Sequence, residues 1–387
     1  YLPSPVAAYT AAAPDCTGDT LLLAQEVGAT LGPSGRDNAL WFPSSIATRA
    51  DGSAAVYPHI ILDRAKPGLI AVNAAGRRFV NEAVSYHEFT RAMYRAHAED
   101  PAAPAIPAWL ICDRRFIWQY GLGLIRPRTP LLGSFLRRGY LHGASTLAGL
   151  AQRIGVDAIG LLETVRAFNA GAARGVDEAF HRGENAYDRA AGDAAHDPNP
   201  CLGPIEAGPF YAVAVVPTPL GTSLGLLTNT AAQVLDARHE AIPGLYACGN
   251  DMHSAFGGEY PGAGSQLGHG MTFGYLAAPA DPKAQHLVTG VWTGNSDASP
   301  TTVLSLSAAG GLWQSYFTEI SSKLPIANFS KPEGLEEVTI DAHTGELPGA
   351  CTTLTTNEYF FPGTAPTTSC STTRLLGIDS ATGLLWA

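Results

Sequence analysis

Several motifs that would assign a chemistry at once are missing from this sequence of 387 residues. Its six cysteines include no CxxC pair and no plausible zinc spacing, so we expect no metal site. No apolar run reaches the length of a membrane span, and no signal peptide is visible. A net charge of −10 argues against a general role in nucleic-acid binding. The start at Tyr1 instead of methionine indicates a fragment or a processed product.

Lysine is nearly missing from the first part of the chain, and its distribution defines a boundary. Residues 1–280 contain 19 arginines and one lysine, whereas residues 281–387 contain one arginine and three lysines. From residue 301 onward, serine and threonine make up 24 of 87 residues. Because such a shift in composition marks at least a domain boundary, we place one near Ala280-Asp281-Pro282.

Strands and helices alternate in the first 280 residues, which favours an α/β or α+β fold. The sequence predicts strand, turn, strand and turn over 56–82, and a buried strand at AWLICD (108–113). Helices are predicted within 15–31 after a cap at Asp15 or Thr17, over 86–98, twice within 145–173, and from MTFGYLAA onward. GLYACG (244–249) is expected to form a short buried strand, and the polar residues 174–204 to wrap the surface.

The most unusual stretch is GGEYPGAGSQLGHGMTFGYLAA, Gly257 to Ala278. A turn so rich in glycine lets the backbone approach another group closely. The helix predicted after it presents free N–H groups and partial positive charge at its start. That arrangement can hold an anion or an electron-rich ring oxygen, such as the N1/C2=O edge of a flavin. The alternative is a surface turn before a core helix.

Four segments together resemble the flavoprotein family of fumarate reductases and 3-ketosteroid dehydrogenases. They are TGD at Thr17–Asp19, RFVNE within Lys66–Phe89, IPGLYACGND, and YPGAG. Thr20 stands where the family has a second glycine after TGD. The resemblance covers roughly residues 10–280. It implies FAD as the cofactor, in a Rossmann-like FAD-binding domain with an inserted α+β substrate domain.

Two tyrosines decide between the branches of this family. Fumarate reductases place arginines after the NE signature and before the final glycine turn, where this sequence has Tyr86 and Tyr260. Arginine suits a dicarboxylate, whereas a tyrosine O–H can donate to a neutral ketone oxygen. The sequence is therefore similar to ketosteroid dehydrogenases. This implies that Tyr260 and the N–H of Gly264 hold the ketone oxygen, that Tyr86 takes the adjacent proton, and that FAD takes hydride.

The same resemblance implies further contacts with the cofactor. The residues concerned are Asp19, Asn250, Ser265, Gln266 and Leu267. Each has a structural alternative: Asp19 could cap a helix, and Tyr86 could simply pack at a helix start. Neither spacing nor family pattern assigns a task to His59, His87 or His253, which are expected to be structural or surface residues.

A complete flavoprotein of this kind needs a GxGxxG turn for the FAD pyrophosphate, and none occurs here. The family carries this fingerprint upstream of the TGD segment, so the chain resembles the C-terminal half of such an enzyme. We expect residues 1–56 and 205–280 to be parts of the FAD-binding domain and 57–204 to be the substrate domain. We expect weak FAD binding and no activity from this half alone, with apolar surface left exposed.

The tail from residue 285 resembles an unrelated family. HLVTGVWTGNSDASP and the segments that follow, to EYFFPGTAPTTSC, are similar to the C-terminal end of penicillin-binding proteins. The motifs SxxK, SxN and KTG are absent, so no acyl transfer is expected. Residues 281–387 are predicted to be a loop-rich β tail in which Cys351 and Cys370 either pair or stay free thiols. The whole chain is interpreted as a chimera joined near 280–286.

The leading hypothesis is an FAD-dependent dehydrogenase that acts next to a ring ketone, with a steroid-like small molecule as its partner. One alternative, suggested by the resemblance of the tail to penicillin-binding proteins, is a non-catalytic cell-wall-associated module. A second is an ene reductase of the fumarate reductase type. The resemblances imply a cytoplasmic location for the flavoprotein part and an extracytoplasmic one for the parent family of the tail.

Overall fold

The computed structural model describes residues 1–12, 16–49, 51–60, 63–277, 335–349 and 352–370. These residues fall into two compact units, 1–277 and 335–370. In the described residues, no helix is long and apolar enough to cross a membrane.

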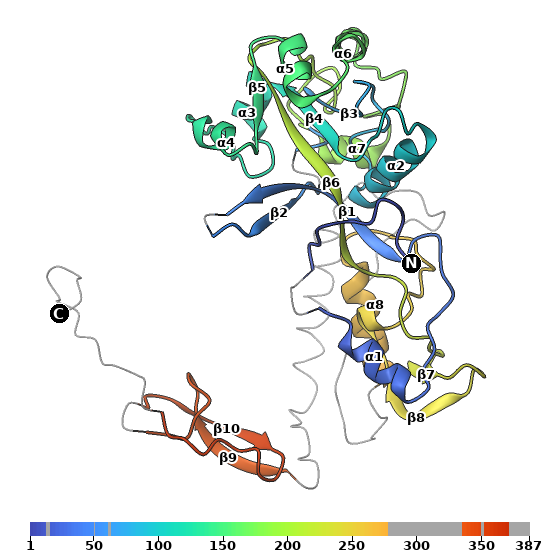
Figure 1. The fold of residues 1–387 in the computed structure, drawn as a ribbon, viewed down its shortest axis with the longest axis vertical. Helices are drawn as coiled ribbons and strands as arrows, with labels where there is room; N and C mark the ends of the chain where they lie inside the picture. Colours follow the sequence, from blue (N-terminus) through green and yellow to red (C-terminus); the bar gives the residue numbers. More distant parts are fainter. Residues whose placement is uncertain (13–15, 50, 61–62, 278–334, 350–351, 371–387) are drawn as a thin grey trace, which may run out of the picture. The chain divides into compact units, whose positions relative to one another are not determined.

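The first unit is built on a six-stranded sheet with the strand order β2-β1-β6-β4-β3, in which β5 also pairs with β6. The strands are β1 (Ala39–Thr48), β2 (Ala54–Pro58), β3 (Leu69–Val72), β4 (Ala108–Asp113), β5 (His142–Ala144) and β6 (Phe210–Thr222). Every pairing in this sheet is antiparallel. Figure 1 shows that β6 runs the length of the sheet, with β4 and β5 along its first half and β1 along its second. The mixed fold predicted from the sequence is thus observed, and this sheet has the antiparallel pairing of an α+β fold.

Helices cover both faces of this sheet. Side chains of β3, β4 and β6 alternate between two apolar clusters, as the two-residue period of a strand requires. On one face Leu69 and Leu110 pack with Phe89 and Met93 of α2 (Tyr86–Glu99). On the other face Ile70 packs with α5 (Leu147–Ile154) and α6 (Ala158–Ala172). The buried strand, the helix over 86–98 and the two helices within 145–173 are therefore present as predicted.

The other elements of this unit are shorter. They are α1 (Asp19–Glu26), α3 (Arg114–Tyr120), α4 (Gly133–Arg137), α7 (Ala186–Ala191), β7 (Gln233–Leu235), β8 (Ala241–Tyr246), the 3-10 helix η1 (Gly249–Asp251) and α8 (Ser265–Ala277). Helices α1 and α8 lie close to the β7–β8 pair (Figure 1), and a small apolar cluster joins them.

Two expectations are wrong in this part of the chain. β8, predicted to be buried, is mostly exposed, because among the described residues it pairs with β7 alone. Helix α1 begins after Gly18, with no side-chain cap from Thr17, and Asp15 lies outside the described residues. Helix α1 with its C-cap, and helix α8, carry exposed apolar side chains, including Leu22, Leu23, Val27, Leu267, Met271 and Tyr275.

The segment 174–204 does not simply wrap the surface, and this is a third correction. It contains α7 and carries Arg182, whose side chain is fully buried. The Arg182 guanidinium donates to the backbone oxygens of Leu69, Arg64 and Lys66. A polar sequence could conceal this core residue because both terminal nitrogens of the Arg182 guanidinium are hydrogen-bonded, which offsets most of the cost of burying the charge.

The second unit contains an antiparallel pair, β9 (Glu336–Asp341) and β10 (Thr355–Phe360). Asp341 ends β9, and its carboxylate accepts the N–H groups of His343 and Thr344, which closes a tight turn. Cys370 is a buried free thiol, 3.1 Å from Thr352 Oγ1. Cys351 lies outside the described residues, as do residues 281–334 of the predicted tail.

Candidate functional site

Tyr86 and Tyr260, which are 174 positions apart, meet through their hydroxyl groups. Tyr86 is the first residue of α2, directly after the N-cap Ser85, whose Oγ accepts the N–H of Glu88 at 3.2 Å. Tyr260 lies in the glycine-rich turn before α8. The two hydroxyl oxygens are 2.5 Å apart, and the ring centroids are 5.3 Å apart. The ring of Phe42 packs against Tyr86 from β1, with centroids 4.7 Å apart.

The surroundings of Tyr86 favour its protonated form. The side chain is buried, and burial raises its pKa; the hydrogen bond with Tyr260 raises the pKa further. The guanidinium of Arg64 lowers it, but as the smallest of these effects. In the absence of a ligand the two hydroxyls therefore satisfy each other, and a carbonyl oxygen that reached Tyr260 would have to compete for this hydrogen bond.

Glycine is required at two positions of the turn that carries Tyr260. At Gly258 the backbone has φ +89°, and a Cβ atom would lie 2.5 Å from the backbone oxygen of Asp37. At Gly264 the backbone has φ +92° with open space where a Cβ would be, so conformation alone selects glycine there. The first glycine allows close packing of two loops, and the second turns the chain into α8.

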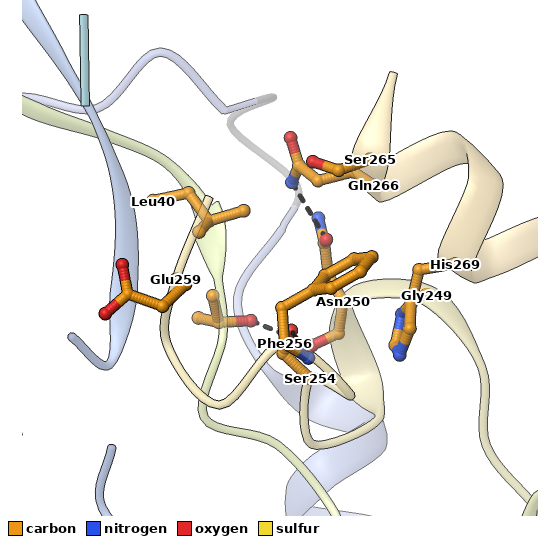
Figure 2. Close-up of a pocket in the computed structure, with 10 residues that line it drawn as sticks. Leu40, Gly249, Asn250, Ser254, Phe256, Glu259, Ser265, Gln266 and His269 are labelled. Carbon is orange, nitrogen blue, oxygen red and sulfur yellow. Dashed lines mark hydrogen bonds between the residues drawn. The ribbon is translucent and has the colours of Figure 1, made fainter. Parts of the chain in front are cut away.

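The start of α8 forms a small polar site with η1. Figure 2 shows Gln266 turned toward Asn250, and its Nε2 donates to Asn250 Oδ1 at 2.9 Å. Asn250 is fixed in turn, because its backbone oxygen accepts the Thr222 hydroxyl at 2.8 Å. The hollow beside these residues measures about 10 Å³, room for about one water molecule. It does not by itself enclose a flavin ring.

The residues at this helix start match one edge of a flavin. In the described residues, the N–H groups of Gln266 and Leu267 have no backbone acceptor, whereas those of Ser265 and Gly268 bond to Gly262 and Gly264. Free N–H groups at a helix N-terminus suit an electron-rich or anionic ring edge. The donor set therefore fits that part of FAD, while the sequence has no GxGxxG turn for the pyrophosphate.

The structure groups the predicted site residues only in part. Tyr86 joins Tyr260, and Asn250 joins Gln266 next to Ser265. Asp19 is an exposed residue in the first turn of α1, and no hydrogen bond in the described residues links it to the others. Its predicted cofactor contact therefore remains a prediction.

The RFVNE signature has a structural task that its sequence alone does not reveal. Arg78 forms a paired contact with Glu82, at 2.8 Å from Nε and 2.7 Å from Nη2, and binds Asp177 as well. Glu82 is fully buried and also receives Arg182 at 3.0 Å and the N–H of Ala71. These contacts lower the pKa of Glu82 against the effect of its burial, so it remains a carboxylate. The pair lies outside any helix, so its spacing in the sequence gave no signal of this contact.

Arg64 fixes the chain that leads into Tyr86. Its side chain is buried and donates to the backbone oxygens of Glu82 and Val84, and also to that of His59. Its guanidinium lies 4.8 Å from the centre of the Phe89 ring in α2. Sequence reasoning missed this residue because no motif contains it.

Two of the three unassigned histidines are buried. His59 bridges Asp63 at 2.7 Å and Ser45 at 2.8 Å, in a closed polar network. His87 accepts the N–H of Trp41, and its ring lies 5.6 Å from that of Tyr260. His59 is thus structural as expected, whereas His87 contributes to the surroundings of the tyrosine pair. No group of three or more His, Cys, Asp or Glu side chains in the described residues could hold a metal ion.

The paired tyrosines and the glycine turn before α8 define a candidate flavoenzyme site. The family model described as "FAD binding domain" matches residues 1–267, and the chain belongs to this family. A second model, the C-terminal domain of penicillin-binding protein 1A, matches residues 331–374. The two resemblances seen in the sequence are therefore confirmed.

Known relatives agree with the first match. The chain is 40% identical over 263 residues to the 4-oxocyclohex-2-ene-1-carboxylate 5-dehydrogenase of Sinomonas cyclohexanicum, covering 67% of this chain and 43% of the relative. It is 40% identical over 272 residues to the 3-oxosteroid 1-dehydrogenase of Mycobacterium tuberculosis H37Rv, covering 70% and 47%. The chain thus spans about half the length of these relatives.

A solved structure resembles the chain as well. It is the 3-ketosteroid delta1-dehydrogenase of Sterolibacterium denitrificans in complex with 1,4-androstadiene-3,17-dione. The TM-score is 0.66 at 43% sequence identity, over 72% of this chain and 49% of that one. The match to the FAD-binding family and the similarity to this structure identify FAD as the cofactor.

Proposed function

We propose that the chain carries the ketone-binding side of an FAD-dependent dehydrogenase that removes hydrogen next to a ring ketone. The observation that carries this proposal is the contact between the Tyr86 and Tyr260 hydroxyls at 2.5 Å. Residues 1–56 and 205–280 would form part of the FAD-binding domain, and 57–204 the substrate domain. Helix α2 supplies Tyr86 from the second part and the glycine turn supplies Tyr260 from the first, and strands of both parts pair in one sheet.

The residues divide the chemistry between them. Tyr260 donates its O–H to the ketone oxygen, and the N–H of Gly264 supplies a second donor, so that negative charge on this oxygen is stabilised. Tyr86, as the phenolate, takes a proton from the carbon next to the ketone. FAD, when bound, supplies the acceptor for the hydride that leaves the neighbouring carbon. One proton and one hydride leave, and the ring gains a double bond conjugated with the ketone.

The substrate class follows from the residues that face the site. A tyrosine pair without a free arginine suits a neutral ketone better than a dicarboxylate. The guanidinium groups of Arg64, which packs on α2, and of Arg91, which belongs to α2, are occupied by backbone oxygens and carboxylates. The relatives that act on oxosteroids and on oxocyclohexene carboxylates support a six-membered ring that carries a ketone.

The experiment begins with FAD. The purified chain is incubated with FAD and desalted, and its visible absorption is recorded. A chain that retains flavin is then given 4-androstene-3,17-dione or 4-oxocyclohexanecarboxylate with a dye as electron acceptor. Dehydrogenation that Tyr260→Phe reduces by 100-fold or more would support the proposal, in line with the usual cost of losing an oxyanion donor. Turnover is not expected of this half alone, so the refuting result is a chain that retains flavin and binds neither ketone in equilibrium dialysis.

A further inference from the structure

Arg91 connects the helix that starts at Tyr86 to the turn that carries Tyr260. It lies on α2, and its side chain is 10% exposed. Its Nη1 is 2.7 Å from Glu259 Oε2, and its Nη2 donates to the backbone oxygen of Gly258 at 3.1 Å. Its Nε donates to the carboxylate of Asp37, in the loop before β1. One guanidinium therefore joins three segments that are far apart in the sequence.

The packing around Arg91 leaves the turn little freedom. A Cβ at Gly258 would lie 2.5 Å from the backbone oxygen of Asp37, so the two loops are in direct backbone contact. Asp37 is held from the other side by the Ser223 hydroxyl, and His87 Nε2 lies 3.5 Å from its carboxylate. Glu259 immediately precedes Tyr260, so the contact is made one residue before the tyrosine.

The charges of this cluster persist over a wide pH range. Burial lowers the pKa of Arg91, but its hydrogen bonds to Glu259 and Asp37 outweigh this effect and the pKa is raised. Burial raises the pKa of Asp37, but the nearby His87 ring and the hydrogen bond from Arg91 outweigh it and the pKa is lowered. The hydrogen bond from Arg91 lowers the pKa of Glu259. Glu88 and Arg36 complete the charged groups that face the cluster.

We propose that Arg91 is a positioning residue, which fixes the Tyr260 hydroxyl against that of Tyr86 by binding Gly258 and Glu259 to α2. The importance of the tyrosine pair rests on the proposed function, but the link itself is independent of FAD. Arginine is suited to the task because its planar fork donates in several directions at once, whereas lysine is a single point charge.

Hydrogen exchange tests the link without cofactor or substrate. The exchange of the peptide that spans residues 254–264 is measured by mass spectrometry in Arg91→Ala and Glu259→Gln, with Arg36→Gln as the matched control. Arg36 contacts the same Glu259 at 3.3 Å but is 65% exposed, so its loss should change little. We expect exchange at least about tenfold faster in the first two variants, because a charge-assisted hydrogen bond no longer opposes local opening.

Glu259→Gln keeps the test valid if Arg91→Ala fails to fold, because Glu259 lies on the surface side of the contact and is 49% exposed. Unchanged exchange in Glu259→Gln, and in Arg91→Ala if it folds, would overturn the proposal. So would equal acceleration in Arg36→Gln, since the effect would then belong to surface charge in general.

A double-mutant cycle tests whether Arg91 acts through Tyr260. The probe is 1,4-androstadiene-3,17-dione, and its dissociation constant is measured by equilibrium dialysis for Arg91→Lys, Tyr260→Phe and the double variant. We expect Arg91→Lys to raise the dissociation constant about tenfold when Tyr260 is present. In the Tyr260→Phe background the same substitution should have no further effect, as for residues that act as one unit. An equal loss in both backgrounds would indicate a merely structural role. If the unsubstituted chain binds no ketone, the proposed function is contradicted. The hydrogen-exchange experiment would still decide whether Arg91 positions the turn.

Discussion

The pH dependence of turnover tests the role of Tyr86 most directly. Tyrosine removes a proton only as the phenolate, yet burial and the hydrogen bond with Tyr260 raise the pKa of Tyr86 above its ordinary value of 10.0. At pH 7 fewer than about one Tyr86 in a thousand is then ionised, and each unit of pH raises this fraction tenfold. If Tyr86 is the base, kcat/KM should increase about 100-fold between pH 7 and pH 9 without a plateau.

The assay follows dye reduction by the FAD-loaded chain with 4-androstene-3,17-dione between pH 6 and pH 10. The ratio kcat/KM is the right quantity, because it reports ionisation in the free protein and so refers to the ligand-free hydroxyl pair. Tyr86→Phe should reduce kcat/KM roughly 100- to 10,000-fold and should also abolish its increase with pH. Tyr120→Phe is the control, since burial and then the hydrogen bond to Asp193 raise the pKa of this tyrosine as well. A plateau below pH 9, or a slope that survives in Tyr86→Phe, would refute the reasoning.

Three further predictions concern stability, and urea unfolding measures each. Burial of Asp63 opposes its charge, but His59 favours it more strongly, and the pKa is lowered from 3.8 to about 2. The Asp63 carboxylate therefore stabilises the fold above pH 3.8, and this stabilisation is lost as the pH falls toward 2. Asp63→Asn should therefore cost about 2 kcal/mol at pH 7 and little near pH 2; an equal cost at both would contradict this. Glu82→Ala should cost about 3–5 kcal/mol, because it leaves Arg78 and Arg182 without their shared carboxylate, whereas the exposed Glu163→Ala should cost under about 1. Phe89→Ala, at a fully buried position of α2, should lower the free energy of unfolding by roughly 3–5 kcal/mol; a loss below about 1 kcal/mol would mean that the core collapses around the gap.

Local pattern was a reliable guide where a segment makes its own core contacts. AWLICD was expected as a buried strand, and it forms β4 with the predicted limits. Residues 86–98 were expected as a helix, and α2 spans Tyr86–Glu99. Both have apolar residues at the period of their element, and both bury them against neighbours in the same domain. β8 has the same kind of pattern and is exposed, because burial needs a neighbour as well as a pattern.

By itself the sequence determined the family, through TGD, RFVNE and YPGAG in order, and the chemical types at the site, through tyrosine at 86 and 260. Only the tertiary structure decided that these hydroxyls touch, that Arg78 and Glu82 serve the scaffold, and that Arg91 holds the turn before Tyr260. The physical reason is the same in each case. A residue's type and neighbours in the sequence set its local conformation, whereas hydrogen bonds and ion pairs between distant segments depend on the path of the whole chain.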